Sequence, residues 1–207
     1  LYMLGAQAVF AARHFGESEG GDALCESIYR SLRYEKENAV LIGMPGCGKS
    51  CMARSLSRKL KMKYIDGDKL IERTFGKRLW EIIGELGMEG FKEIEEKTLL
   101  SINDDNAIIA PGGSSVYYPS VMEHCKKLGK IIYLYCSYEV IEQRLGDFSK
   151  RGVVLKENQT LRDLYDERCA LYRKYADITV DCSGIAFPKY QARVINAINM
   201  LYAYSDN

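Results

Sequence analysis

The sequence predicts an α/β protein in which a parallel five-stranded sheet is flanked by helices on both faces. Two observations predict this class. Short apolar segments alternate with segments of helical periodicity from residue 39 onward, and this alternation is typical of parallel sheets. A glycine-rich loop follows the first apolar segment and precedes a helical pattern, which is the setting of phosphate-binding loops. The chain has 207 residues, of which 47% are hydrophobic, and can bury one core of this kind.

Residues 1–36 are expected to form a helical appendage. Apolar residues recur at helical spacing over residues 1–15 and 24–32, and a glycine-rich segment at 17–21 separates the two patterns. The chain begins with Leu1 and has no basic leader segment, so we expect it to be an internal fragment of a longer protein.

Five strands are expected after this appendage. They lie at residues 39–42, 64–65, 107–110, 130–135 and 178–180. The interval from Lys69 to Ile102 is mostly helical in pattern, whereas residues 144–160 are polar and weakly patterned. A stretch of the second kind in a compact domain suggests a mobile lid, and Thr160 with Asp163 resembles a capping box that begins the next helix.

Charge and cysteine content restrict the class of partner. The chain has 29 Lys and Arg against 28 Asp and Glu, so no global field attracts nucleic acid or an anionic membrane, and we expect a small-molecule partner. No stretch reaches the roughly 18 apolar residues that a membrane span needs. Seven cysteines without a C-x-x-C pair predict a reducing, cytoplasmic location and no zinc site.

The glycine-rich loop carries the clearest chemical signal. It reads Gly-Met-Pro-Gly-Cys-Gly-Lys-Ser and fits the pattern G-x-x-x-x-G-K-[ST]. Its glycines permit a tight turn, so that successive N–H groups and a helix N-terminus converge on the phosphates of a nucleotide. Lys49 is expected to reach the β- and γ-phosphates, and Ser50 to ligate Mg²⁺. The nucleotide-binding residues predicted from the loop are Gly43, Met44, Pro45, Gly46, Cys47, Gly48, Lys49, Ser50 and Cys51. The alternative is a glycine-rich turn without a ligand.

Polar groups also follow the second and third predicted strands, at the sheet edge where ligands of open α/β folds bind. Asp66 and Asp68 can serve Mg²⁺ and a substrate hydroxyl separately; alternatively, Asp68 only caps the helix that starts at Lys69. The segment 111–114, Pro-Gly-Gly-Ser, offers backbone N–H groups at the same edge, or is a plain turn.

Two arginines are candidates for binding an anion. Arg151 lies in the predicted lid, and Arg168 lies in the helical pattern that follows it. Each can pair with a phosphate or a carboxylate. The alternative for each is a solvated surface charge.

These motifs, in this order, resemble the shikimate kinase family, whose members are small P-loop kinases that phosphorylate the 3-hydroxyl of shikimate with ATP in aromatic amino acid biosynthesis. The resemblance runs from about Asn38 to Asp181 and includes Phe91-Lys92 with Glu95, and Arg168 with Leu171-Tyr172. It implies a kinase domain over residues 37–207, with a substrate-binding insertion at about 68–104 and a lid at about 145–160.

The resemblance also implies a role for each candidate residue. Lys49 and Ser50 hold ATP and Mg²⁺, and Asp66 supports the metal through water. Asp68 binds and orients the attacking hydroxyl, and Arg151 stabilises charge on the transferring phosphoryl. Arg144 stands where the family often places a residue against the adenine. The implied substrate-binding set is Asp68, Lys92, Gly112, Gly113, Ser114 and Arg168.

Three departures from the family pattern concern the substrate. Lys92 replaces an arginine that binds the carboxylate, and it keeps the charge but loses the planar fork. Ser114 replaces a third glycine and adds a side chain where the substrate ring would approach, and Gly152 replaces a proline after Arg151. Another hydroxy acid such as gluconate therefore stays open as substrate. A non-catalytic nucleotide-binding module is the further alternative, against which the presence of Lys49 and both aspartates argues.

The appendage carries a second, shorter resemblance. Residues 2–8, followed by Phe10 and Phe15-Gly16, are similar to the closing helix of shikimate dehydrogenases, in which the glutamine corresponding to Gln7 contacts shikimate. This likeness implies a parent protein in which a dehydrogenase and a kinase are fused. An accidental likeness between short amphipathic helices is the alternative.

Overall fold

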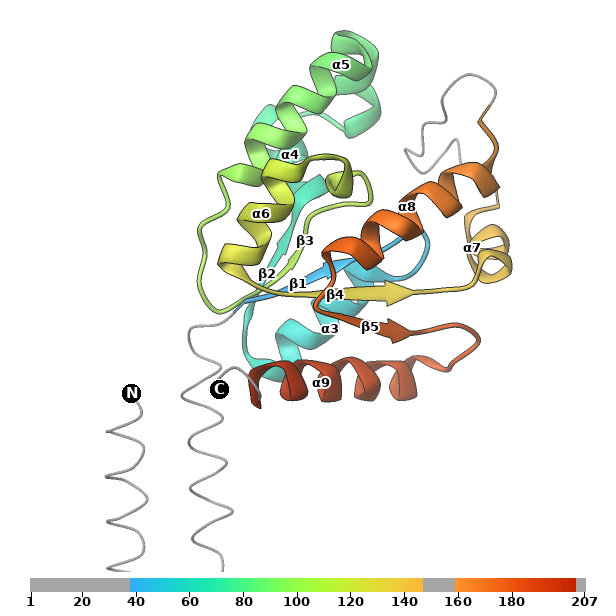
Figure 1. Cartoon of the computed structure of the whole chain (residues 1–207). Helices are drawn as coiled ribbons and strands as arrows, with labels where there is room; N and C mark the ends of the chain where they lie inside the picture. The colour runs from blue at the N-terminus through green and yellow to red at the C-terminus, as the bar shows by residue number, and fades with distance from the viewer. Residues whose placement is uncertain (1–37, 147–158, 204–207) are drawn as a thin grey trace, which may run out of the picture. The chain divides into compact units, whose positions relative to one another are not determined.

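The computed structural model describes residues 38–146 and 159–203, and its centre is a five-stranded sheet (Figure 1). The strands are β1 (Asn38–Ile42), β2 (Lys63–Asp66), β3 (Ala107–Ala110), β4 (Gly129–Tyr135) and β5 (Ile178–Asp181). Their order is β2-β3-β1-β4-β5, and every neighbouring pair is parallel. The predicted sheet is confirmed: β3 has the expected bounds, and each of the others is longer by one or two residues.

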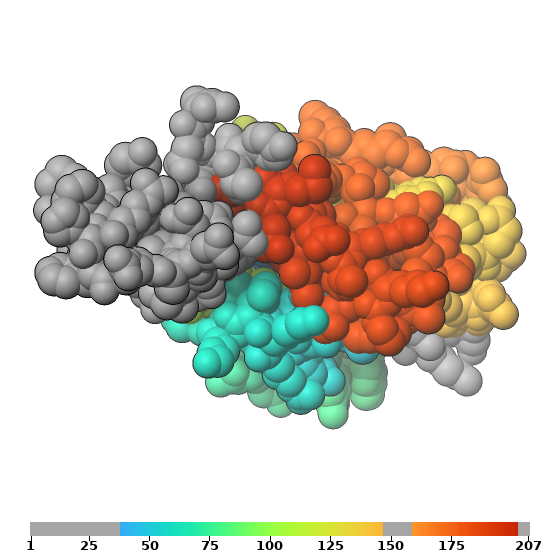
Figure 2. Space-filling model, turned by 90° about the horizontal axis from the view of Figure 1, so that it is seen from below, coloured from blue at the N-terminus to red at the C-terminus, as the bar shows by residue number. Residues whose placement is uncertain are grey.

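Helices cover both faces of this sheet. They are α3 (Lys49–Leu60), α4 (Gly67–Phe75), α5 (Leu79–Leu100), α6 (Pro119–Leu128), α7 (Tyr138–Leu145), α8 (Leu161–Tyr175) and α9 (Phe187–Ala203), with a 3₁₀ turn, η1, at Ser115–Tyr117. One face carries α3 and α9, and the other carries α6 and α8 (Figure 1). Seen from below, α9 forms a large part of the described surface (Figure 2). In the described part of the chain, no helix is both long and apolar enough to cross a membrane.

The strand order determines where a ligand can bind. All five residues of β1 are buried, as expected for a central strand covered on both faces. In this order β1 is the central strand, with β3 on one side of it and β4 on the other. This is the point at which the strand order reverses, and a crevice opens there in doubly wound sheets. The glycine-rich loop, which directly follows β1, is therefore at the position that favours ligand binding.

Two helices form the long insertion between β2 and β3. Ile71 of α4 packs with Ile82 and Phe91 of α5 in a small core of their own. The sequence predicts mostly helix from Lys69 to Ile102, and this prediction is confirmed, with a break at 76–78 between the two helices. Gly87 interrupts α5 with non-helical dihedral angles, φ 69° and ψ 179°.

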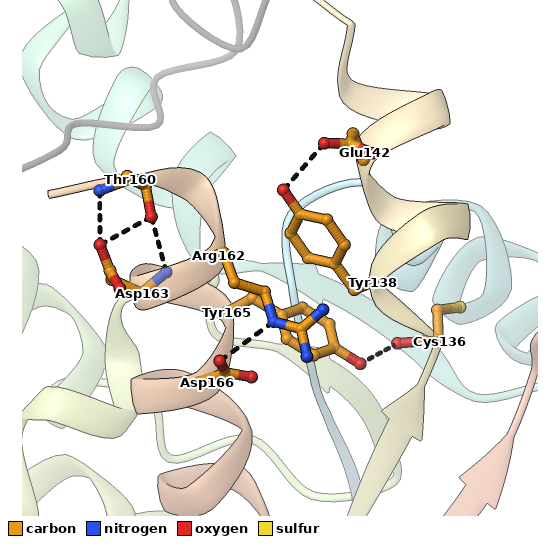
Figure 3. A network of polar contacts seen from close by, with 8 residues as sticks. All are labelled: Cys136, Tyr138, Glu142, Thr160, Arg162, Asp163, Tyr165 and Asp166. Atoms are coloured by element: carbon orange, nitrogen blue, oxygen red, sulfur yellow. Dashed lines mark hydrogen bonds and ion pairs between the residues drawn. The ribbon is translucent and has the colours of Figure 1, made fainter.

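Residues 147–158 are not described, and polar contacts surround the helices that flank them, α7 and α8 (Figure 3). Arg162 of α8 lies 4.8 Å from the ring centroid of Tyr138 on α7 and pairs with Asp166 at 3.1 Å. The capping box at Thr160 and Asp163 is confirmed, because each side chain accepts the backbone N–H of the other. The expected appendage and Arg151 lie outside the described residues.

Candidate active site

One cavity of about 850 Å³ collects most of the predicted site residues. The glycine-rich loop, the ends of β2 and β3, the α4–α5 insertion and α8 all contribute to its wall. The predicted residues that line it are Pro45, Gly46, Gly48, Lys49, Ser50, Cys51, Asp66, Asp68, Lys92, Gly112, Gly113, Ser114 and Arg168. The structure therefore brings together residues that are more than 100 positions apart in the sequence.

The loop after β1 is shaped by its glycines. Gly46 and Gly48 have φ values of 83° and 97°, which residues with a side chain rarely adopt. A Cβ on Gly43 would lie 2.7 Å from the carbonyl oxygen of Leu134 in β4, so only glycine fits this close approach. The side chains of Met44 and Cys47 are buried, which leaves only their backbone groups available to a phosphate.

Lys49 extends across this loop. Its Nζ donates to the carbonyl oxygens of Gly43 and Met44, at 2.7 and 3.0 Å. The residue is only 9% exposed, so its ammonium is held at the cavity wall. Ser50 is exposed in the first turn of α3 beside it.

Asp66 and Asp68 have different environments. Asp66 caps α4 by accepting the backbone N–H of Lys69 at 3.3 Å, and it accepts a hydrogen bond from the Tyr64 hydroxyl at 2.5 Å. The alternative in which Asp68 caps this helix is therefore wrong. Burial, and then the nearby charge of Asp66, raise the pKa of Asp68 above its usual range.

The turn after β3 packs tightly against Asp68. Gly112 has a φ of 95°, and a Cβ there would lie 2.9 Å from Oδ1 of Asp68. A side chain at Gly112 would thus collide with the carboxylate that faces the cavity.

Lys92 lies on α5 and lines the same cavity as Arg168. Its Nζ donates to Glu89 at 2.6 Å, and about half of its side chain is exposed. Its ammonium therefore has an acidic partner on its own helix.

Glu95 is a site residue to which the sequence assigns no role. It lines the cavity, is 1% exposed, and accepts hydrogen bonds from Ser114 Oγ at 2.5 Å and from the Tyr118 hydroxyl at 2.8 Å. Burial raises its pKa, and the two hydrogen bonds oppose that shift. The hydroxyl of Ser114 is thus engaged by α5. The family resemblance includes Glu95 but gives it no role, and nothing in the sequence indicates its contacts with Ser114 and Tyr118.

Arg168 is 7% exposed, so its interpretation as a solvated surface charge is wrong. Its guanidinium carbon lies 5.2 Å from the ring centroid of Tyr117, and its Nε lies 3.4 Å from the Tyr117 hydroxyl. A buried guanidinium at the wall of a cavity is suited to a carboxylate ligand.

Arg144 approaches the glycine-rich loop from α7. Its Nη1 lies 3.5 Å from the carbonyl oxygen of Gly46 and 3.7 Å from Sγ of Cys136. The side chain is otherwise exposed, and it stands at the loop rather than in the cavity wall.

Comparison with known proteins agrees with this site. The family model "Shikimate kinase" matches residues 45–198. The shikimate kinase of Thermodesulfovibrio yellowstonii is 32% identical over 168 residues, which cover 80% of this chain and 96% of that protein. That of Francisella tularensis subsp. novicida is 30% identical over 172 residues, covering 81% and 94%. The structure of shikimate kinase from Acinetobacter baumannii in complex with shikimate matches with a TM-score of 0.74 at 29% identity, covering 83% of this chain and 98% of that one. With this sheet, this loop and these relatives, the chain belongs to the shikimate kinase family.

Proposed function

We propose that the protein transfers the γ-phosphoryl group of ATP to the 3-hydroxyl of shikimate, giving shikimate 3-phosphate and ADP. One observation carries the proposal: a single cavity holds the loop lysine Lys49, the carboxylate of Asp68 and the buried guanidinium of Arg168. These are a phosphate ligand, a group that can orient a hydroxyl, and a carboxylate ligand. Family membership supports the same reaction.

The nucleotide end of the cavity is suited to ATP with Mg²⁺. The loop N–H groups and Lys49 offer positive charge to the phosphates, and Arg144 stands beside the loop for the adenine. The hydroxyl of Ser50 and the carboxylate of Asp66, acting through water, are the hard oxygen donors that Mg²⁺ prefers. When bound, Mg²⁺ neutralises charge on the phosphate oxygens.

At the centre of the cavity, Asp68 accepts the proton of the attacking hydroxyl. The hydroxyl oxygen forms a bond to the γ-phosphorus while the bond to the β–γ bridging oxygen breaks, and ADP leaves. Because burial raises the pKa of Asp68, its carboxylate is a better proton acceptor than an exposed one. Arg151 of the proposed lid supplies charge to the transferring phosphoryl group.

The part of the cavity lined by Arg168 and Lys92 binds the carboxylate of shikimate. Arg168 offers its fork, Lys92 offers a point charge, and the turn offers the backbone N–H groups of Gly112, Gly113 and Ser114.

A coupled assay of ADP release tests this function. Shikimate, gluconate and buffer alone are compared as acceptors, with Lys49→Ala as the control for catalysis at this site. We expect release that depends on shikimate and a loss of at least about a hundredfold in the control, since it removes a transition-state charge contact. A preference for gluconate would identify another hydroxy-acid kinase. ATP binding without turnover of either acceptor would identify a nucleotide-binding module.

We also propose the wider organisation of the chain. Residues 37–207 are the kinase domain, with the insertion at about 68–104 and the lid at about 145–160, and residues 1–36 are the remnant of an upstream shikimate dehydrogenase. The likeness of residues 2–8 to a dehydrogenase helix supports the fusion. An upstream reading frame without a dinucleotide-binding fold would contradict it. A cytoplasmic location is supported by the cysteines of the described ranges, all six of which are free thiols.

A further inference from the structure

Tyr172 joins the helix that carries Arg168 to the glycine turn after β3. Its side chain is fully buried, and its hydroxyl donates to the carbonyl oxygen of Gly113 at 2.7 Å. The ring of Tyr133 in β4 packs against it, with ring centroids 5.1 Å apart. Because the sheet holds the ring and α8 holds the backbone, the hydroxyl has one fixed position against the turn.

This hydrogen bond also fixes the peptide that links Gly113 to Ser114. In a planar trans peptide, the carbonyl group and the following N–H point in opposite directions. A carbonyl directed at the buried Tyr172 therefore turns the Ser114 N–H to the other side of the turn. Gly113 and Ser114 both line the cavity. The side of this peptide that faces away from Tyr172 is therefore the side from which the Ser114 N–H can reach a ligand in the cavity.

Arg168 stands one helical turn before Tyr172 and faces the same turn. Its Nη1 would lie 3.3 Å from a Cβ built on Gly113. The guanidinium and the Ser114 N–H are thus two donors on neighbouring walls, and α8 reaches both walls through Arg168 and Tyr172.

We infer that Tyr172 is a positioning residue for the substrate carboxylate. Its hydroxyl sets the geometry between the backbone donor of the turn and the guanidinium of Arg168, so that both reach one carboxylate. The inference rests on the proposed shikimate kinase activity. Tyr172 itself touches no substrate and acts through Gly113.

The chain offers a matched pair of variants to test this role. Tyr172→Phe removes one hydroxyl and leaves the packed ring. Tyr165→Phe does the same about two turns earlier on α8. There the Tyr165 hydroxyl donates to the carbonyl oxygen of Cys136, also at 2.7 Å (Figure 3). Both residues are buried, so each variant loses an equivalent bond from the same helix.

The measurements are KM for shikimate, KM for ATP, kcat and Tm for both variants. We expect Tyr172→Phe to raise KM for shikimate about fivefold, which corresponds to a weakening of the contact between the Ser114 N–H and the carboxylate by about 1 kcal/mol. The value of kcat should stay within about twofold, because shikimate binding is lost equally in the ground state and the transition state. KM for ATP should also stay within about twofold, because the β3 turn is proposed to contact shikimate and not ATP. Tyr165→Phe should lower Tm to a similar extent and leave KM for shikimate unchanged. The same KM for shikimate in both variants would overturn the inference.

Two further measurements separate positioning from a loss of stability. In an Arg168→Lys background, the effect of Tyr172→Phe on kcat/KM should shrink, because the geometry being set is that of the guanidinium. Full additivity would contradict the role.

Placing 4-aminophenylalanine at position 172 restores a hydrogen-bond donor and should restore KM for shikimate. This variant also tests the role if Tyr172→Phe does not fold. A wild type inactive on shikimate would overturn both the function and the inference, whereas an active wild type with unchanged KM in Tyr172→Phe overturns the inference alone.

Discussion

Two carboxylates separated by one glycine serve different purposes at the end of β2. Asp66 is tied to the fold, because it caps α4 and accepts the Tyr64 hydroxyl. Asp68 faces the cavity and has a raised pKa because it is buried. Loss of the Asp68 charge should therefore affect the reaction without unfolding the helix.

Asp68→Asn tests this separation. We expect kcat to fall at least about a hundredfold, since the amide cannot accept the proton. The far-UV circular dichroism should be unchanged, because the cap is Asp66. Retention of more than half of the wild-type rate in the coupled ADP assay would show that Asp68 has no such role.

The same variant makes a prediction about stability and pH. A carboxyl whose pKa is raised on folding favours the folded state below its unfolded pKa, here 3.8, and this contribution is lost as pH rises through the folded pKa. Above the unfolded pKa, the buried Asp68 carboxyl thus lowers the stability of the wild type. Asp68→Asn should raise Tm at pH 7, and the gain should shrink as the pH is lowered toward 4. A gain that stays constant with pH would contradict this account.

Lys92 provides a residue-scale test of substrate preference. An arginine there restores the planar fork, so Lys92→Arg should lower KM for shikimate about fivefold with little change in kcat. Lys97→Arg is the matched control, because Lys97 is also exposed on α5 but does not line the cavity. Weaker shikimate binding in Lys92→Arg would indicate that Lys92 marks a different acceptor.

At the scale of elements, the junction between the β3 turn and α4 leaves no space. Gly112→Ala places a methyl group 2.9 Å from Asp68 Oδ1 in a residue with φ of 95°, so we expect kcat/KM for shikimate to fall at least tenfold, on the order of 1.4 kcal/mol. Gly76→Ala is the control, because Gly76 also has a positive φ, 65°, but has open space around it. Similar activity in both variants would show that the contact with Asp68 is unimportant.

Elements formed by local apolar runs could be predicted from the sequence, whereas those that depend on distant partners could not. The strand β3 was predictable because Ala107–Ala110 is a short apolar run that is buried throughout. The polar Asn38 begins β1 only because its amide bonds the backbone of Asp104, Ala107 and Leu128, more than 60 residues away.

The residues of the candidate site likewise fall into those that the sequence predicts and those that it does not. The loop around Lys49 could be predicted because its residues are consecutive. The contacts of Glu95 with Ser114 and of Tyr172 with Gly113 join residues 19 and 59 positions apart. Only the packing of α5 and α8 around the β3 turn brings these groups together, so no local sequence pattern predicts these contacts.

At the scale of the whole molecule, the described sheet starts at Asn38, two positions after the last residue of the proposed appendage. Deletion of residues 1–36 should therefore leave kinase turnover within about threefold, under 1 kcal/mol in activation free energy. Steady-state rates of the full chain and the truncated chain, compared at equal concentration of active sites, test this. A larger loss would show that the appendage shapes the site.

The glycine-rich loop and the α4–α5 pair differ in how closely they are tied to the central sheet, because the loop directly follows the central strand β1. The strand β1 pairs with β3 on one side and with β4 on the other, so a substitution that changes the packing of β1 acts on both neighbours and on the loop that follows β1. The α4–α5 pair packs around its own small core of Ile71, Ile82 and Phe91, and it contributes Lys92 and Glu95 to the cavity. A substitution in this helix pair can thus change the cavity wall that carries Lys92 and Glu95 while the central strands and the glycine-rich loop keep their packing.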